Sequence, residues 1–111
     1  MKRSLALIAT LAVSGAVAVP ALAATKRIKI GDNYFVKKGT QPKITLKRGT
    51  KVTWTWPNTG VPHNVTVISG PVTFRSPTKT KGTYSKRMTR KGTYQISCTI
   101  HSGMNMTLKV R

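Results

Sequence analysis

Acidic side chains are almost absent from this sequence. Asp32 is the only carboxylate residue against 20 lysines and arginines, so the 111 residues carry a formal net charge of +19. A field of this sign and strength favours encounters with anionic partners and keeps a protein soluble, at some cost to its compactness. The charge identifies no chemistry by itself, because a solvated basic surface is also compatible with the absence of any specific site.

Cysteine and histidine are scarce too. Cys98 is the only cysteine, which excludes a disulfide framework within the chain, and there are two histidines. Two histidines are too few for a multicopper oxidase, and no C-x-x-C-H motif is present for covalent haem attachment. A single cysteine leaves three explanations open: a buried inert thiol, an intermolecular disulfide or a metal thiolate.

The first 23 residues have the three-part layout of a secretory signal peptide. A basic start at positions 2 and 3 precedes an apolar run over residues 5–19, and alanines occupy positions 21 and 23. We expect cleavage after Ala23 and export to the periplasm or the extracellular side of the cell envelope. An uncleaved membrane anchor is the alternative, although Gly15 and Pro20 interrupt a run that is short for a membrane span. Residues 24–111 would form the mature domain.

No helical periodicity of apolar residues lasts for ten residues in this domain. Short alternating runs are separated instead by Gly, Pro, Asn and Thr, a pattern typical of an all-β protein. About seven strands, each about five residues long, fit a sandwich of two antiparallel sheets. We expect these strands near residues 27–30, 43–47, 51–56, 63–67, 83–87, 93–98 and 106–110.

The side chains that can bind a metal gather in two short segments. One contains His63, and the other, over residues 98–106, contains Cys98 and His101 together with two methionines. His63 has the parity of Val65 on its strand and Cys98 that of Ile96, so both are expected to point inward. One thiolate and two imidazoles can then meet at one end of the sandwich. Two His and one Cys with a weak axial Met define blue-copper electron-transfer sites, so the sequence predicts one type 1 copper ion.

The two segments together resemble a known family. Pro62-His63-Asn64-Val65 followed by Cys98-x-x-His101-x-x-Met104 is similar to the plastocyanin/amicyanin branch of the cupredoxins, the blue type 1 copper proteins, over nearly all of residues 24–111. The resemblance implies a Greek-key β-sandwich and single-electron transfer. It implies that His63, Cys98 and His101 bind copper, with the edge of His101 near the surface. It also implies that Asn64 links the two ligand segments.

The axial methionine is left open between two residues. Met104 gives the shorter spacing of amicyanin-like proteins, and Met106 gives the longer spacing of plastocyanin. Met106 shares parity with Leu108 in the last strand, so it has a ready role in the core. We therefore favour Met104. Ser102 stands where many family members with a short loop have proline, a departure that leaves the redox potential open.

Other functions compete with electron transfer. The same ligands could serve copper storage, delivery or resistance without redox turnover, and zinc could occupy them, although a thioether is a poor fourth ligand for a structural zinc site. A cationic binding domain with an incidental thiol is a third hypothesis. The export signal argues against nucleic acid as its ligand, and so does the lack of a basic stripe with interleaved aromatic residues.

No enzymatic activity is expected, because the only acid, Asp32, is far from Cys98 and both histidines in the sequence. The partners we expect are acidic redox proteins that dock around His101, and the charge also suits association with an anionic cell envelope. The domain is expected to be a monomer.

Overall fold

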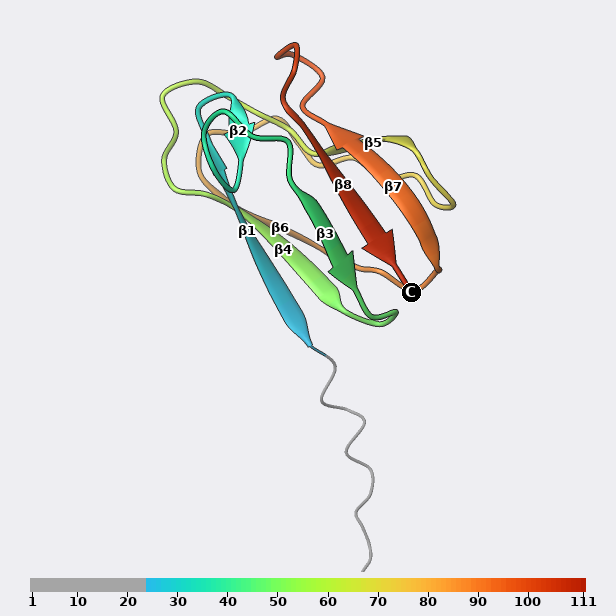
Figure 1. The fold of residues 1–111 in the computed structure, drawn as a ribbon. Coiled ribbons are helices and arrows are strands. Elements are labelled where there is room, and N and C mark those ends of the chain that lie inside the picture. The colour runs from blue at the N-terminus through green and yellow to red at the C-terminus, as the bar shows by residue number, and fades with distance from the viewer. Residues whose placement is uncertain (1–23) are drawn as a thin grey trace, which may run out of the picture.

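The computed structural model describes residues 24–111, and the predicted signal peptide lies outside this range. All regular elements within it are β-strands (Figure 1). The strands are β1 (Thr25–Gly31), β2 (Tyr34–Phe35), β3 (Lys43–Leu46), β4 (Lys51–Trp56), β5 (Thr66–Ser69), β6 (Gly82–Arg87), β7 (Gly92–Ser97) and β8 (Asn105–Val110). No helix in residues 24–111 is long and apolar enough to cross a membrane.

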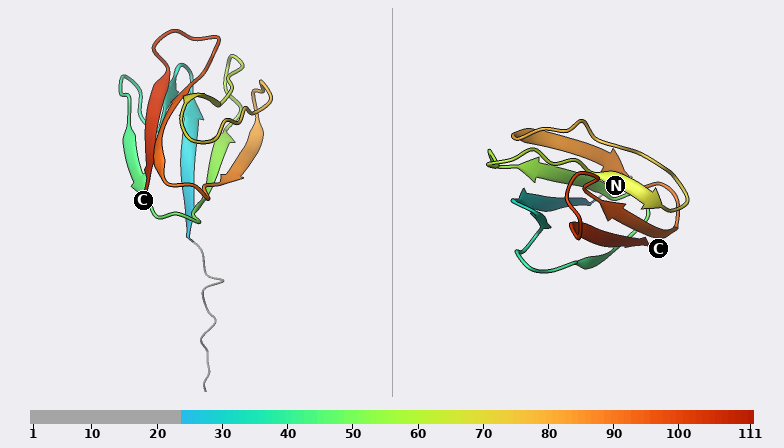
Figure 2. Two further views of the ribbon diagram at one scale, coloured as in Figure 1. Left: turned by 90° about the vertical axis from the view of Figure 1, so that its right-hand side faces the viewer. Right: turned by 90° about the horizontal axis from the view of Figure 1, so that it is seen from above.

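The strands form two four-stranded sheets that face each other, with the orders β2-β1-β4-β6 and β3-β8-β7-β5 (Figure 2). The predicted β-sandwich is therefore confirmed. The expectation that both sheets are antiparallel was wrong, since β1 pairs in parallel with β4 and β3 pairs in parallel with β8. Between β1 and β4 the chain crosses to the other sheet to form β3, and it returns in the original direction.

The inner faces of the two sheets form the core, and their alternation follows the sequence pattern. In four strand regions, the side chains that share one face by alternation are all buried: Val52, Trp54 and Trp56; His63, Val65 and Val67; Tyr94, Ile96 and Cys98; Met106, Leu108 and Val110. Burying the apolar ones contributes roughly 25 cal/mol per Å² of apolar surface removed from water. This core fixes the strands whose ends carry the metal-binding side chains.

One predicted strand begins later than its alternation suggests. The strand expected over residues 63–67 starts at Thr66, because the preceding backbone bonds to a loop instead of to a sheet. Val65 donates its backbone N–H to the hydroxyl of Ser76, and the backbone groups of His63 exchange two hydrogen bonds with Lys79. His63 is thus held in an isolated bridge just outside the sheet.

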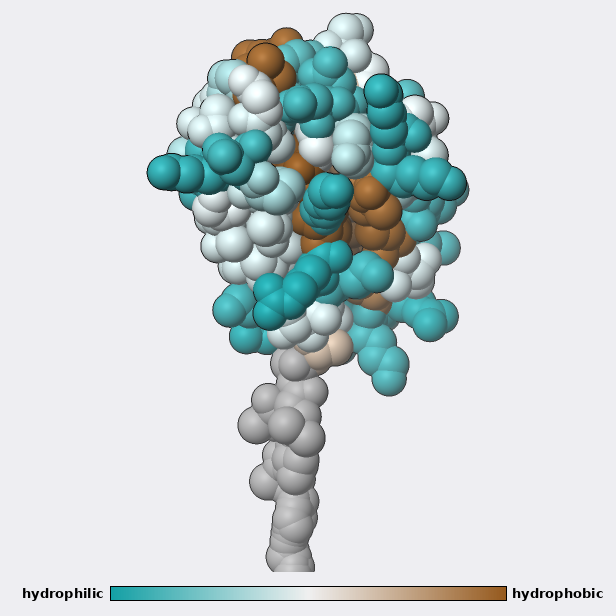
Figure 3. Space-filling view, turned by 90° about the vertical axis from the view of Figure 1, so that its left-hand side faces the viewer, coloured by the Kyte–Doolittle hydropathy of each residue, from teal (hydrophilic) through white to brown (hydrophobic). Residues whose placement is uncertain are grey.

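Three loops meet at the end of the sandwich that lies opposite the C-terminus (Figure 1). They are the turn between β1 and β2, the loop after β4 that contains His63, and the loop between β7 and β8. The surface around them is mostly polar. Hydrophilic side chains project over much of the face in Figure 3, with apolar patches between them and at the loop end.

Candidate metal centre

The two predicted metal-binding segments lie side by side at this loop end. His63 lies in the loop between β4 and β5, and Cys98 directly follows the last residue of β7. His101 lies in the loop between β7 and β8, which closes on itself because Cys98 donates its backbone N–H to the carbonyl of Met104 at 3.0 Å. Gly103 has φ of 82°, a left-handed conformation that glycine adopts without strain and that suits this tight loop.

The side chains of His63, Cys98 and His101 converge. One ligand atom from each of the three lies within 4.8 Å of the others. The two Nδ1 atoms of the histidines face each other at 3.0 Å, and Sγ of Cys98 is 3.4 Å from Nδ1 of His101. His63 and Cys98 are buried, whereas His101 is half-buried. One cysteine sulfur and two imidazole nitrogens therefore share one small site, in which only His101 is partly exposed.

His63 is fixed from several sides. Its carbonyl accepts a hydrogen bond from the indole N–H of the buried Trp56 at 3.0 Å, in addition to the backbone bonds with Lys79. The ammonium of Lys79 lies over the ring of Trp56, 5.3 Å from its centroid. The backbone of His63 is therefore restrained by three hydrogen bonds, which limits how far its imidazole can move from the site.

Asn64 connects the two segments. Its amide Nδ2 donates to the hydroxyl of Thr99 at 2.9 Å, and its Oδ1 accepts the backbone N–H of Thr99 at 3.2 Å. The backbone N–H of Asn64 points at Sγ of Cys98 at 3.5 Å. A hydroxyl from Thr78 and another from Thr66 complete the amide's hydrogen bonds. The link between the segments that the family resemblance implied is thus present, with Asn64 fully buried.

Asp32 is the site residue that the sequence analysis missed. It lies in the turn between β1 and β2, and its Oδ1 is 3.3 Å from Nε2 of His63. Its large sequence separation from the histidines led us to expect it elsewhere, but the fold brings that turn to the loop end. The one available signal was its uniqueness, since a lone acid in so basic a chain invites an explanation.

The electrostatics of this pair follow from its placement. Burial lowers the pKa of His63, the hydrogen bond to Asp32 opposes that effect, and the neighbouring His101 lowers it further. The hydrogen bond from His63 holds the pKa of Asp32 below its ordinary value of 3.8. In the metal-free protein, His63 therefore favours its neutral form, which is the form that can bind a metal.

The two candidate methionines have different surroundings. Met104 is buried in the loop that closes on Cys98, and its backbone N–H donates to the carbonyl of His101 at 3.3 Å. Met106 belongs to β8, where it is opposite Ile96 of β7 in the strand register. Met104 is thus tied by its backbone to both Cys98 and His101, and Met106 is part of the regular sheet.

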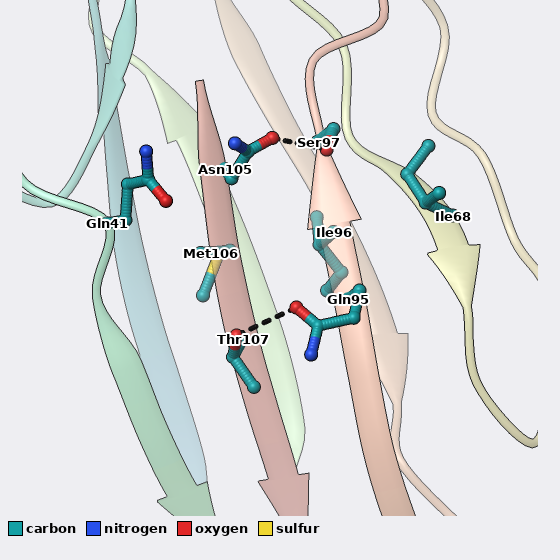
Figure 4. Close-up of a pocket in the computed structure, with 8 residues that line it drawn as sticks. All are labelled: Gln41, Ile68, Gln95, Ile96, Ser97, Asn105, Met106 and Thr107. Atoms are coloured by element: carbon teal, nitrogen blue, oxygen red, sulfur yellow. Dashed lines mark hydrogen bonds between the residues drawn. The ribbon is translucent and has the colours of Figure 1, made fainter. Parts of the chain in front are cut away.

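A separate groove of about 270 Å³ lies on the outer face of the second sheet (Figure 4). Polar side chains from β7 and β8 pair across it, where the hydroxyl of Thr107 donates to Oε1 of Gln95 and that of Ser97 donates to Oδ1 of Asn105. The groove lacks histidine, cysteine and acidic residues. It is therefore distinct from the metal centre.

The donor set fits copper. The two Nδ1 atoms share a hydrogen bond at 3.0 Å, which one metal ion could replace by using a lone pair from each, and the sulfur of Cys98 is adjacent. Imidazole suits several metals, but two imidazoles with one thiolate and a nearby thioether are the arrangement of blue copper sites. Fold and site together define a cupredoxin, a small β-sandwich with a copper centre at one end.

Comparison with known proteins supports the assignment to the cupredoxins. The family described as copper binding proteins, plastocyanin/azurin family, matches residues 24–111, and the chain belongs to this family. It is 36% identical over 113 residues to amicyanin-alpha of Methylorubrum extorquens, an alignment that covers 92% of this chain and 93% of that protein. The resemblance to the cupredoxins and the prediction of copper as the cofactor are thereby confirmed.

Solved structures show the same fold. The oxidized form of a mutant amicyanin superposes with a TM-score of 0.62 at 26% identity, covering 78% of this chain and 81% of that one. A purple cupredoxin from Nitrosopumilus maritimus gives a TM-score of 0.64 at 26% identity, covering 78% of this chain and 99% of that one.

Proposed function

We propose that this protein is a small exported type 1 copper protein that carries single electrons between redox partners. His63 and His101 would hold the copper ion through imidazole nitrogens, Cys98 through its sulfur and Met104 through its thioether, with Met106 in the core. The observation that carries the proposal is the convergence of two Nδ1 atoms and one Sγ within 4.8 Å in a largely buried site.

Copper bound there would supply a one-electron couple between Cu(I) and Cu(II). The protein's part is to keep the ligands in one geometry for both states, which the hydrogen bonds to Asn64, Trp56 and Lys79 support. Burial of His63 and Cys98 keeps water from the ligand atoms. The half-buried ring of His101 is the route by which an electron would enter and leave.

The first test is a visible and EPR spectrum of the purified domain after addition of Cu(II), with Cys98→Ser alongside. We expect an intense blue thiolate-to-copper band and narrow copper hyperfine splitting, both lost in the variant. A colourless protein, or a copper spectrum indifferent to the substitution, would contradict the proposal. Cu(I) that a chelator removes rapidly, with no reversible oxidation, would indicate copper delivery instead.

We assign no catalytic residue. A Cys–His pair is present in Cys98 and His101, but the thiol is only 3% exposed, so a substrate has little access to it. Thiolate nucleophiles in enzymes occupy partly exposed positions.

The partner is proposed to be an acidic redox protein that docks around His101 and the loops at Gly60–Pro62 and Gly103–Met104. Residues 24–111 carry 18 of the 20 lysines and arginines and a formal net charge of about +17. The exposed Ile100, beside His101, adds an apolar contact. Electron-transfer rates with acidic partners should fall steeply as salt is added; rates that ignore salt would contradict electrostatic docking.

Export is proposed from the signal-like residues 1–23, and the family match that begins at residue 24 supports a mature domain of residues 24–111. Native mass spectrometry of the secreted protein should show a monomer whose chain begins at Ala24. A retained leader in a membrane fraction would identify an anchor, and release from the envelope by salt would identify electrostatic association.

A further inference from the structure

The contact between Asp32 and His63 goes beyond the ligand set. Asp32 and Asn33 form the tip of the tight turn between β1 and β2, where Gly31 pairs with Tyr34. Asn33 has φ of 68°, a left-handed conformation that asparagine tolerates better than most residues. The turn is therefore well defined, and it places the chain's only acidic side chain at the metal centre.

One oxygen of this carboxylate faces three N–H groups. Oδ1 of Asp32 is 3.3 Å from Nε2 of His63, 3.2 Å from the backbone nitrogen of Gly60 and 3.5 Å from that of Val61. A Cβ at Gly60 would lie 3.3 Å from Oδ2, so the loop and the carboxylate are closely packed here. The carboxylate thus joins the turn, the loop after β4 and the imidazole of His63.

We propose that Asp32 is a positioning residue that keeps the proton of His63 on Nε2 and so directs the Nδ1 lone pair toward Cys98 and His101. A neutral imidazole carries its proton on one nitrogen and a lone pair on the other. An ionised carboxylate only accepts hydrogen bonds, so it favours the tautomer with the proton on Nε2. The facing pair of Nδ1 atoms, 3.0 Å apart, lies on the opposite side of the ring.

The same contact has an electronic consequence, which rests on the proposed copper function. A carboxylate hydrogen-bonded to a ligating histidine makes that histidine a stronger donor. A stronger donor and a nearby negative charge both favour Cu(II) over Cu(I). Such partners typically change metal affinity by 10- to 100-fold. Because the side chain of Asp32 is 58% exposed, water screens part of this charge, and we expect the preference for Cu(II) over Cu(I) to change by only about tenfold.

Three variants test the proposal. Asp32→Ala removes the acceptor and the charge, whereas Asp32→Asn removes the charge but keeps an oxygen for the N–H groups of Gly60 and Val61. Thr45→Lys is the matched control, since it makes the same change in net charge at an exposed residue of β3 that has no part in the site. Circular dichroism establishes that each variant is folded.

The first measurement is long-range ¹H–¹⁵N NMR on the metal-free protein. We expect the wild-type protein and Thr45→Lys to hold His63 in the Nε2–H tautomer. Asp32→Ala should show a mixture of both tautomers, and Asp32→Asn a smaller shift in the same direction. Tautomer populations in Asp32→Ala equal to those of the control would overturn the proposal.

The second measurement is the copper potential. We expect both Asp32 variants to lose about tenfold in their preference for Cu(II) over Cu(I), which corresponds to a rise of about 59 mV, while Thr45→Lys stays at the wild-type value. A normal potential and tautomer in Asp32→Asn, with changes in Asp32→Ala alone, would show that Asp32 only anchors the loop and would overturn the proposal.

The two proposals can fail separately. If the wild-type protein forms no thiolate-to-copper band, the proposed function fails, yet the tautomer of His63 in the metal-free protein still decides the role of Asp32. If Asp32→Ala does not fold, Asp32→Asn tests the role of Asp32 in both measurements, because asparagine has nearly the same shape as aspartate.

Discussion

Met104 and Met106 are both buried, yet a substitution should affect them differently. Met104→Leu removes the thioether from the loop that closes on Cys98. We expect an altered copper spectrum and a higher potential, because the axial ligand tunes the potential and a weak donor contributes more to Cu(II) than to Cu(I). Cyclic voltammetry and EPR of the copper-loaded protein measure both.

Met106→Leu is the control for this experiment. It conserves volume in the core and should cost less than about 1.5 kcal/mol of stability without moving the potential. A potential that shifts in Met106→Leu and not in Met104→Leu would assign the axial position to Met106.

The lowered pKa of His63 predicts a pH dependence of the metal-free protein. The unfolded chain binds a proton to this residue near the ordinary value of 6.5, whereas the folded chain resists protonation. The resulting stability is present above pH 6.5 and is lost as the pH falls from there toward the lowered folded pKa. Melting temperatures measured between pH 8 and pH 5 should therefore decrease toward acid.

His63→Gln cannot titrate at this position, so its melting temperature should depend less on pH over the same range. A wild-type protein that becomes more stable as the pH falls from 6.5 would contradict the assignment of a neutral buried imidazole. Copper must be absent in both samples, because a bound metal competes with the proton for Nδ1.

Within β4, two buried tryptophans on the same face offer a matched comparison. Trp56 donates its indole N–H to the carbonyl of His63, whereas Nε1 of Trp54 has no hydrogen-bond partner. Each change to phenylalanine removes similar apolar volume. We expect Trp56→Phe to lower the free energy of unfolding by about 1–2 kcal/mol more than Trp54→Phe, because only the former breaks a hydrogen bond.

Urea unfolding of the two metal-free variants measures this difference. Trp56→Phe should also weaken copper binding, since His63 loses one of its backbone restraints, and Trp54→Phe should not. Equal stabilities in the two variants would show that the bond from Trp56 to His63 contributes nothing net.

At the level of the strands, what could be predicted depended on local alternation. Burial of Trp54, Ile96 and Leu108 follows from parity within a single strand, and so does the inward direction of Cys98. The parallel pairing of β1 with β4 could not be predicted, because it depends on the chain crossing to the other sheet to form β3, and alternation carries no information about which strands become neighbours.

The contacts of the site also fall into those that the sequence predicts and those that it does not. The placement of Cys98 and His101 together is nearly local, because they share one short loop, and the contact of that loop with His63 was implied by family resemblance. Asp32 is 31 residues from His63, and its approach depends on how the β1–β2 turn packs against the loop after β4. Neither composition nor spacing determines the contact between two such loops.

For the molecule as a whole, the basic charge also protects two of the four edge strands. β3 and β6 each form the edge of a sheet, and both carry exposed cationic residues, among them Lys43 and Arg87. Charged side chains on edge strands prevent pairing with other chains. The cationic side chains of β3 and β6 thus disfavour association of this chain through those two edges.

Stability at this scale should depend on the metal. Residues 24–111 form a small domain without a disulfide, and such domains have a small free energy of unfolding unless another constraint helps.

Ligand binding to the folded state alone stabilises that state by about 4 kcal/mol when free ligand is 1,000 times the Kd. In a domain of this size 1 kcal/mol raises Tm by roughly 4–8 °C. We therefore expect copper at a free concentration of about 1,000 times its Kd to raise Tm by more than about 10 °C in calorimetry. Copper should raise the Tm of Cys98→Ser far less, because this variant lacks the sulfur ligand. An equal gain in the variant would mean that copper stabilises the protein through other residues, and no gain in either would mean that the fold does not depend on the metal.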